Sequence, residues 1–136
     1  MSTFVDTSAF YAVIDAADEM HPSAKTEWLR LLGDEPELCT TNYVLVETFA
    51  LLQSRIGLDA VRLFSEEMTP VLRILWVDSS AHESAVELYL TANRRELSFV
   101  DCVSIQAMRS RGVRDVFCFD RHFSERGFLI HPTRQR

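Results

Sequence analysis

The chain has 136 residues, of which 47% are hydrophobic and 25% charged. This composition predicts one globular domain over residues 1–136, with a core that needs no disulfide or metal to fold. No apolar run approaches the ~18 residues of a membrane span and no secretory signal is visible, so we expect a cytoplasmic protein without membrane contact.

The net charge of −6 is distributed unevenly along the chain. Residues 1–93 carry 5 basic and 15 acidic side chains, whereas residues 94–136 carry 9 basic and 5 acidic ones, and all nine are arginines. Such asymmetry indicates a face that binds a polyanion. A solvated surface that is rich in arginine is the alternative interpretation.

The first segment predicts a short buried strand over residues 2–5, followed by Asp6 and then by Thr7 and Ser8 at the start of a helix. Asp6 would then lie at the carboxyl end of a strand, where open α/β sheets place their ligands. A helix-capping role for Asp6 is the alternative.

The rest of the chain alternates between helices and strands. Ser80 with Glu83 and Ser98 with Asp101 have the spacing of capping boxes, and Gly112 is expected to end a helix. Helices are predicted over residues 22–32, 43–55, 58–68, 81–92 and 99–111, and strands over residues 37–40, 72–77, 116–119 and 128–130. This alternation predicts an α/β fold with a parallel sheet that is covered on both faces.

Three further acids can join Asp6. Glu47 lies on a helix with apolar neighbours, where an unpaired acid is costly to bury. Asp101 lies in the first turn of its helix, where it can cap the helix, face the sheet edge, or do both. Asp120 directly follows an apolar strand, as Asp6 does, although a turn role is also plausible for it.

These four acids would need a cation or shared protons if they cluster. Two ionised carboxylates about 5 Å apart repel each other by roughly 3 kcal/mol at an effective dielectric of about 20. Oxygen ligands without clustered His or Cys select a hard cation such as Mg²⁺ or Mn²⁺. Because such a metal activates water and stabilises charge on phosphate, the pattern favours phosphodiester hydrolysis.

The order of these motifs resembles the PIN-domain family and, within it, the VapC-type ribonuclease toxins of prokaryotic toxin–antitoxin pairs. The resemblance spans the whole chain. The motifs are Phe4-Val5-Asp6-Thr7-Ser8, Glu47, the segment 97–104 around Asp101, and Phe119-Asp120-Arg121-His122-Phe123.

The resemblance implies a PIN-like (Rossmann-like) three-layer α/β/α sandwich with a mainly parallel central sheet. It also implies an Mg²⁺- or Mn²⁺-dependent endoribonuclease with a cognate antitoxin, and homodimers are common in the family. Its catalytic and metal-binding residues would be Asp6, Glu47, Asp101 and Asp120, with Thr7 and Ser8 as supporting hydroxyls. Cys118 departs from the family, because many relatives carry Thr or Ser there, which puts a local hydroxyl contact in doubt.

Guanidinium groups suit phosphate, so several arginines are candidates for binding the RNA backbone. The candidates are Arg94, Arg95, Arg109, Arg111, Arg121 and Arg126, together with His122, for which a solvated loop position is equally plausible. Phe64, Met68, Leu72 and Trp76 are expected in the core, with a dimer or antitoxin groove as the alternative.

Other functions remain open at this point. A PIN-like module could bind RNA or protein without cutting, and a PIN nuclease could serve RNA processing instead of a toxin role. A phospho-acceptor receiver domain is excluded, because that family uses a Lys on a late strand and the single lysine here is Lys25.

Overall fold

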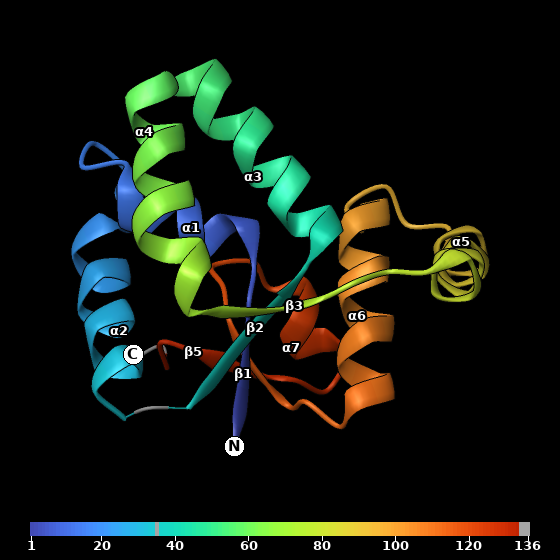
Figure 1. The fold of residues 1–136 in the computed structure, drawn as a ribbon. Helices are drawn as coiled ribbons and strands as arrows, with labels where there is room; N and C mark the ends of the chain where they lie inside the picture. The colour runs from blue at the N-terminus through green and yellow to red at the C-terminus, as the bar shows by residue number, and fades with distance from the viewer. Residues whose placement is uncertain (35, 134–136) are drawn as a thin grey trace.

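The structure is a computed structural model, and it describes residues 1–34 and 36–133. Its centre is a five-stranded sheet whose neighbouring strands pair in parallel (Figure 1). The spatial order is β3-β2-β1-β4-β5, so the first strand of the chain lies in the middle. The strands are β1 (Ser2–Val5), β2 (Glu37–Thr41), β3 (Leu72–Leu75), β4 (Asp115–Phe117) and β5 (Leu129–His131).

Helices cover both sides of this sheet, with α1, α2 and α4 on one side and α6 and α5 on the other (Figure 1). The predicted three-layer α/β/α arrangement is therefore confirmed. The α-helices are α1 (Thr7–Ile14), α2 (His21–Asp34), α3 (Asn42–Arg55), α4 (Leu58–Leu63), α5 (Ser79–Ala92), α6 (Phe99–Arg111) and α7 (His122–Glu125). A π-helical turn, η1 (Phe64–Met68), and a 3₁₀ turn, η2 (Thr69–Val71), lead from α4 into β3. Among the described residues, no helix is long and apolar enough to cross a lipid bilayer.

The central strands carry the core. Phe4 and Val5 of β1 and Val116 and Phe117 of β4 are fully buried, as expected for strands that are covered on both faces. Phe10 of α1 packs edge-on against Phe64, with ring centroids 4.9 Å apart. This packing holds α1, which begins just after β1, against η1.

Local signals placed several helix ends correctly. Ser98 caps α6 in a complete capping box with Asp101, and Gly112 ends that helix with φ 68°, a left-handed conformation that suits glycine. Thr41 caps α3, since its hydroxyl accepts a hydrogen bond from the Val44 amide at 3.2 Å.

Other predictions in this region were wrong. The cap of α5 is Asp78, whose side chain accepts from the Ala81 amide at 2.8 Å, so the predicted Ser80 cap lies two residues too late. Strand β3 ends at Leu75 and not at Val77, and the side chain of Trp76 is 74% exposed, so this tryptophan is not a core residue. Phe64 and Met68 are buried, as predicted.

Candidate active site

Asp6 lies at the carboxyl end of the central strand β1 and caps α1. Its backbone amide donates to the Phe117 carbonyl at 3.0 Å, which extends the pairing of β1 with β4 by one residue. Its carboxylate accepts from the Ser8 hydroxyl at 2.7 Å and from the Ser8 amide at 3.2 Å. The two interpretations of Asp6 are thus compatible, because one buried carboxylate caps the helix and faces the sheet edge.

The two hydroxyls after Asp6 hold this region together. The Ser8 hydroxyl also accepts from the Phe119 amide at 3.0 Å, so it connects α1 to the segment that follows β4. Thr7 is buried, and its hydroxyl lies 3.3 Å from that of Thr48 on α3. The supporting role of Thr7 and Ser8 stays a prediction, and these contacts are the ones on which it would depend.

Asp101 is oriented by the start of α6. Its carboxylate accepts from the Ser98 amide at 3.1 Å, and its own amide donates to the Ser98 hydroxyl at 3.0 Å. The aspartate is 9% exposed. The capping box thus holds a nearly buried acid at the sheet edge in a fixed rotamer.

Asp120 comes from the segment between β4 and α7. Its Oδ1 accepts from the His122 amide at 3.1 Å and also lies 3.1 Å from His122 Nε2. Ligand atoms of Asp101, Asp120 and His122 lie within 4.8 Å of one another. The Cys118 thiol donates to the Asp120 carbonyl at 3.4 Å. A thiol therefore makes a local contact at the position where many relatives carry a Thr or Ser hydroxyl.

Glu47 reaches the same place from α3 and is half-buried. Glu47 does not lie on a largely buried helix face, which corrects the prediction, since Val46 beside it is 68% exposed. The buried face of α3 is formed by Val44, Thr48 and Leu52, and Glu47 lies at its border.

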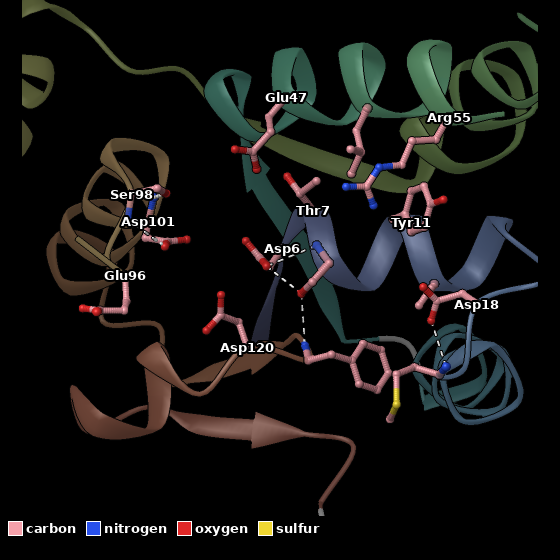
Figure 2. Close-up of a pocket in the computed structure, with 15 residues that line it drawn as sticks. Asp6, Thr7, Tyr11, Asp18, Glu47, Arg55, Glu96, Ser98, Asp101 and Asp120 are labelled. Atoms are coloured by element: carbon pink, nitrogen blue, oxygen red, sulfur yellow. Dashed lines mark hydrogen bonds between the residues drawn. The ribbon is translucent and has the colours of Figure 1, made fainter. Parts of the chain in front are cut away.

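One cavity of about 530 Å³ joins these residues. Figure 2 shows the carboxylates of Asp6, Glu47, Asp101 and Asp120 facing a common opening from four separate elements. The structure therefore places all four acids that the sequence singled out around one cavity, whereas the group of three possible ligands within 4.8 Å of one another in the described part of the chain is Asp101, Asp120 and His122, without Asp6 and Glu47. Three charged lining residues were missed by the sequence analysis: Asp18, Arg55 and Glu96. Of these, Arg55 had a sequence signal, because Glu47, Leu51 and Arg55 follow one another at four-residue spacing on one helix face.

Burial makes this site electrostatically unfavourable on its own. The pKa of Asp6 is raised from its ordinary 3.8 to about 7, mainly by desolvation and further by the charges of Asp101 and Glu47, against the lowering effect of the Ser8 hydrogen bonds. The pKa of Asp101 is also raised, first by burial and then by the charge of Asp120, although hydrogen bonds from Ser98 oppose the rise. A bound cation would relieve both shifts.

The donor set fits a hard divalent cation. Carboxylate oxygens are the ligands that Mg²⁺ and Mn²⁺ prefer, and a cation beside Asp6 and Asp101 would offset the burial that chiefly raises the pKa of both carboxyls. The tightest group of possible ligands includes His122, which the sequence analysis treated as a phosphate contact.

The arginines proposed for the RNA backbone lie further out. Arg94 pairs with Glu125 at 3.8 Å, and both side chains are about half exposed. Among the described residues, neither Arg94 nor Arg95 lines the acidic cavity. Arg121 lines a smaller cavity of about 270 Å³ that shares Phe119 and Asp120 with the acidic one. Their predicted role stays a prediction.

These features define an α/β protein with an acidic site at the carboxyl edge of a parallel sheet. Residues 3–129 match the family model described as PIN domain, so the chain belongs to the PIN-domain family. It is 37% identical over 127 residues to the 23S rRNA-specific endonuclease VapC20 of Mycobacterium tuberculosis, across 93% of this chain and 95% of the relative.

Solved structures agree with this assignment. The crystal structure of M. tuberculosis VapC20, described as a Sarcin-Ricin loop cleaving toxin, superposes with a TM-score of 0.81 at 36% identity, over 93% of this chain and 96% of that one. VapBC2 of Rickettsia felis, bound to a DNA fragment from its promoter, gives a TM-score of 0.70 at 12% identity, over 96% and 98% of the two chains. The second likeness concerns the fold alone.

Proposed function

We propose that this protein is a metal-dependent endoribonuclease that hydrolyses a phosphodiester bond of 23S rRNA. The observation that carries the proposal is the convergence of Asp6, Glu47, Asp101 and Asp120 on one cavity of a PIN-domain chain. The substrate class follows the relative with 37% identity, which is named a 23S rRNA-specific endonuclease.

Asp6, Asp101, Asp120 and Glu47 would hold Mg²⁺ or Mn²⁺. When bound, such an ion supplies an activated water and stabilises the negative charge that develops on phosphate. The protein contributes orientation: Ser8 fixes the Asp6 carboxylate and the Ser98 amide fixes that of Asp101. Glu47 is half-buried and approaches from α3, so it completes the site opposite Asp120 (Figure 2).

The same proposal includes a biological context. The protein acts as the toxin of a pair, in the cytoplasm where ribosomes are found, and a cognate antitoxin restrains it. Support comes from VapC20, described as a toxin, and from VapBC assemblies among proteins of the same fold. A homodimer is the proposed state of the free protein, and sedimentation of the purified chain measures it directly.

Cleavage of a synthetic sarcin–ricin loop hairpin and of intact ribosomes tests the activity. We expect cutting with Mg²⁺ or Mn²⁺, none with EDTA, and none by Asp6→Asn. Asp59→Asn is the matched control, because Asp59 is an exposed acid in the first turn of α4 and does not line the cavity. Full activity of Asp6→Asn, or activity in EDTA, would overturn the proposal.

A further inference from the structure

Arg55 brings positive charge into a cavity that is otherwise lined by acids. Six carboxylate residues line this cavity: Asp6, Asp18, Glu47, Glu96, Asp101 and Asp120. Among its lining residues in the described part of the chain, Arg55 is the single arginine or lysine. A polyanion that enters this cavity meets one fixed cation contributed by the protein.

The position of Arg55 is set by α3 and by a tyrosine. Arg55 is in the last turn of α3. It follows Glu47 and Leu51 at four-residue spacing, and the side chains of Arg55 and Glu47 line the same cavity. Its guanidinium carbon lies 5.4 Å from the centroid of the Tyr11 ring, a cation–π distance. The Tyr11 hydroxyl donates to Asp15 at 2.6 Å, which fixes the ring on which Arg55 rests. Arg55 is exposed, and its contact with the Tyr11 ring favours one position of the guanidinium before any ligand arrives.

Arg55 interacts with Tyr11, but no carboxylate of the described residues occupies its donors. The hydrogen bond to Asp15 chiefly raises the pKa of the Tyr11 hydroxyl, and the interaction with Arg55 partly lowers it. Within residues 1–34 and 36–133, Arg55 forms no ion pair at 4.0 Å or less, whereas Arg30, Arg73 and Arg94 each do. Asp15, the acid beside Tyr11, is engaged by the tyrosine hydroxyl, and this bond is the main cause of the lowered pKa of Asp15. A planar fork of five N–H donors thus faces the cavity on an aromatic support.

The cavity has two chemically different ends. Figure 2 shows Arg55 and Tyr11 together at one end, with Asp18 on the same side, whereas Asp101 and Asp120 lie at the other end. Asp6 and Glu47 lie between the two ends, and the Asp18 carboxylate accepts from the Met20 amide at 2.8 Å. The end that holds Asp101 and Asp120 suits a metal ion and the phosphate that is cut. The Arg55 end suits an anion that is bound without being cut, because guanidinium pairs with phosphate in a bidentate geometry.

We propose that Arg55, supported by Tyr11, forms a second phosphate-binding subsite, which holds an RNA phosphate adjacent to the scissile one. This inference rests on the proposed function, since it names how the same substrate is gripped. A contact at a neighbouring phosphate fixes the register of the strand relative to the acids, and it carries no base specificity. Arg55 is therefore a substrate-binding residue that does not contact the reacting atoms.

Binding and cleavage of the sarcin–ricin loop hairpin test the subsite separately. Binding is measured by fluorescence anisotropy in Mg²⁺, with Asp6→Asn as the non-cleaving background, at several salt concentrations. On that background, Arg55→Gln is expected to weaken binding about tenfold. The variant should also make the fall of log K with log salt less steep, by roughly 0.7 to 0.9 in slope, which is the value for one phosphate contact.

Two further variants separate this role from bulk charge. Arg55→Lys keeps the charge but loses the fork, so the salt slope should stay while affinity falls about threefold. Arg73→Gln removes an exposed arginine on β3 that pairs with Glu37 at 3.3 Å and does not line the cavity, so it should leave both affinity and slope unchanged. In the cleaving protein, Arg55→Gln should raise KM about tenfold with kcat within threefold.

Circular dichroism establishes that each variant is folded. The subsite is overturned if folded Arg55→Gln binds with unchanged affinity and slope, or if Arg73→Gln weakens binding equally. Arg55→Ala gives the same test should Arg55→Gln fail to fold, since unchanged affinity and slope in that variant would equally contradict a phosphate contact. A wild-type protein that binds the hairpin but never cuts it would sink the proposed function, and the anisotropy data would still decide the subsite.

Discussion

The Ser8 hydroxyl accepts a hydrogen bond from the Phe119 amide at 3.0 Å, although the two residues are 111 positions apart in the chain. The same hydroxyl donates to the Asp6 carboxylate at 2.7 Å. One side chain therefore fixes an acid after β1 and the backbone just before Asp120, the acid after β4. The pairing of β1 with β4 makes this contact possible, because it places both strand ends at one edge.

Replacing Ser8 with alanine should loosen both connections. We expect Ser8→Ala to lose about 1–3 kcal/mol of unfolding free energy, because the Phe119 amide is left without its partner. Cleavage should fall by about 10- to 100-fold, as expected when a group that orients a metal ligand is removed. Urea denaturation and hairpin cleavage measure the two effects, with Ser110→Ala on the exposed side of α6 as control. Wild-type activity in Ser8→Ala would show that Asp6 needs no such support.

Helix ends that depend on neighbouring residues were predicted most accurately from the sequence. Ser98, Asp101 and Gly112 were assigned correctly because a capping box and a left-handed helix end depend on residues within a few positions. The cap of α5 was misassigned because both Asp78 and Ser80 are good caps, and only the path of the chain after β3 selects between them.

Tertiary placement was harder to predict. Trp76 looked like a core residue because it continues an apolar run, yet β3 is the edge strand and the chain leaves the sheet after Leu75. The Val77 amide then bonds to the Asn42 side chain at 2.8 Å instead of to a neighbouring strand. Asp18 and Glu96 come from loops, where no periodicity indicates the direction of a side chain.

The four predicted acids were found because each follows a recognisable element boundary or fits the family order. Their positions around one cavity agree with the sequence argument, and membership of the PIN-domain family is confirmed. Their roles in metal binding and cleavage stay predictions, which the following experiments address.

The stability of the metal-free protein should fall as pH rises. Because the pKa of Asp6 is about 7 in the folded chain and near 3.8 when unfolded, the folded state holds the proton more tightly between these values. Unfolding free energy should therefore decrease from about pH 4 to about pH 7, by up to roughly 4 kcal/mol from this group alone. Asp6→Asn in EDTA should flatten this dependence and melt higher than wild type at pH 8.

Melting curves at pH 5 and pH 8 with EDTA test this linkage, and Asp59→Asn, an exposed acid, should melt like wild type at both. Adding Mn²⁺ should stabilise the wild type at pH 8 far more than at pH 5, because a protonated Asp6 cannot bind metal. Equal loss of stability with pH in wild type and Asp6→Asn would contradict the assignment of the raised pKa.

Asp101→Asn and Ser98→Ala should separate the two roles of the α6 capping box. In Asp101→Asn the side-chain oxygen can still accept from the Ser98 amide, so the fold should persist while cleavage falls about 100-fold or more. In Ser98→Ala the cap hydroxyl is lost at about 1 kcal/mol, but the backbone amide that orients Asp101 remains, so activity should stay within a few fold. Thermal melts and cleavage rates measure both. Equal losses of activity in the two variants would mean that Asp101 acts mainly as a cap.

His122 Nε2 lies 3.1 Å from Asp120 Oδ1, and His122 belongs to the group of possible metal ligands that includes Asp101. Whether His122 binds metal can be tested by comparing metals that differ in their preference for imidazole. Mg²⁺ prefers oxygen ligands, whereas imidazole suits softer transition metals. We therefore expect His122→Gln to keep Mg²⁺-supported cleavage within threefold and to weaken Zn²⁺ binding by about tenfold. Isothermal titration with each metal and cleavage at saturating metal make the comparison, and His82→Gln on α5 is a matched control, since its ring contacts Tyr43 outside the site. A loss of Mg²⁺-supported cleavage beyond tenfold in His122→Gln alone would place the imidazole in the catalytic set and correct the all-carboxylate prediction.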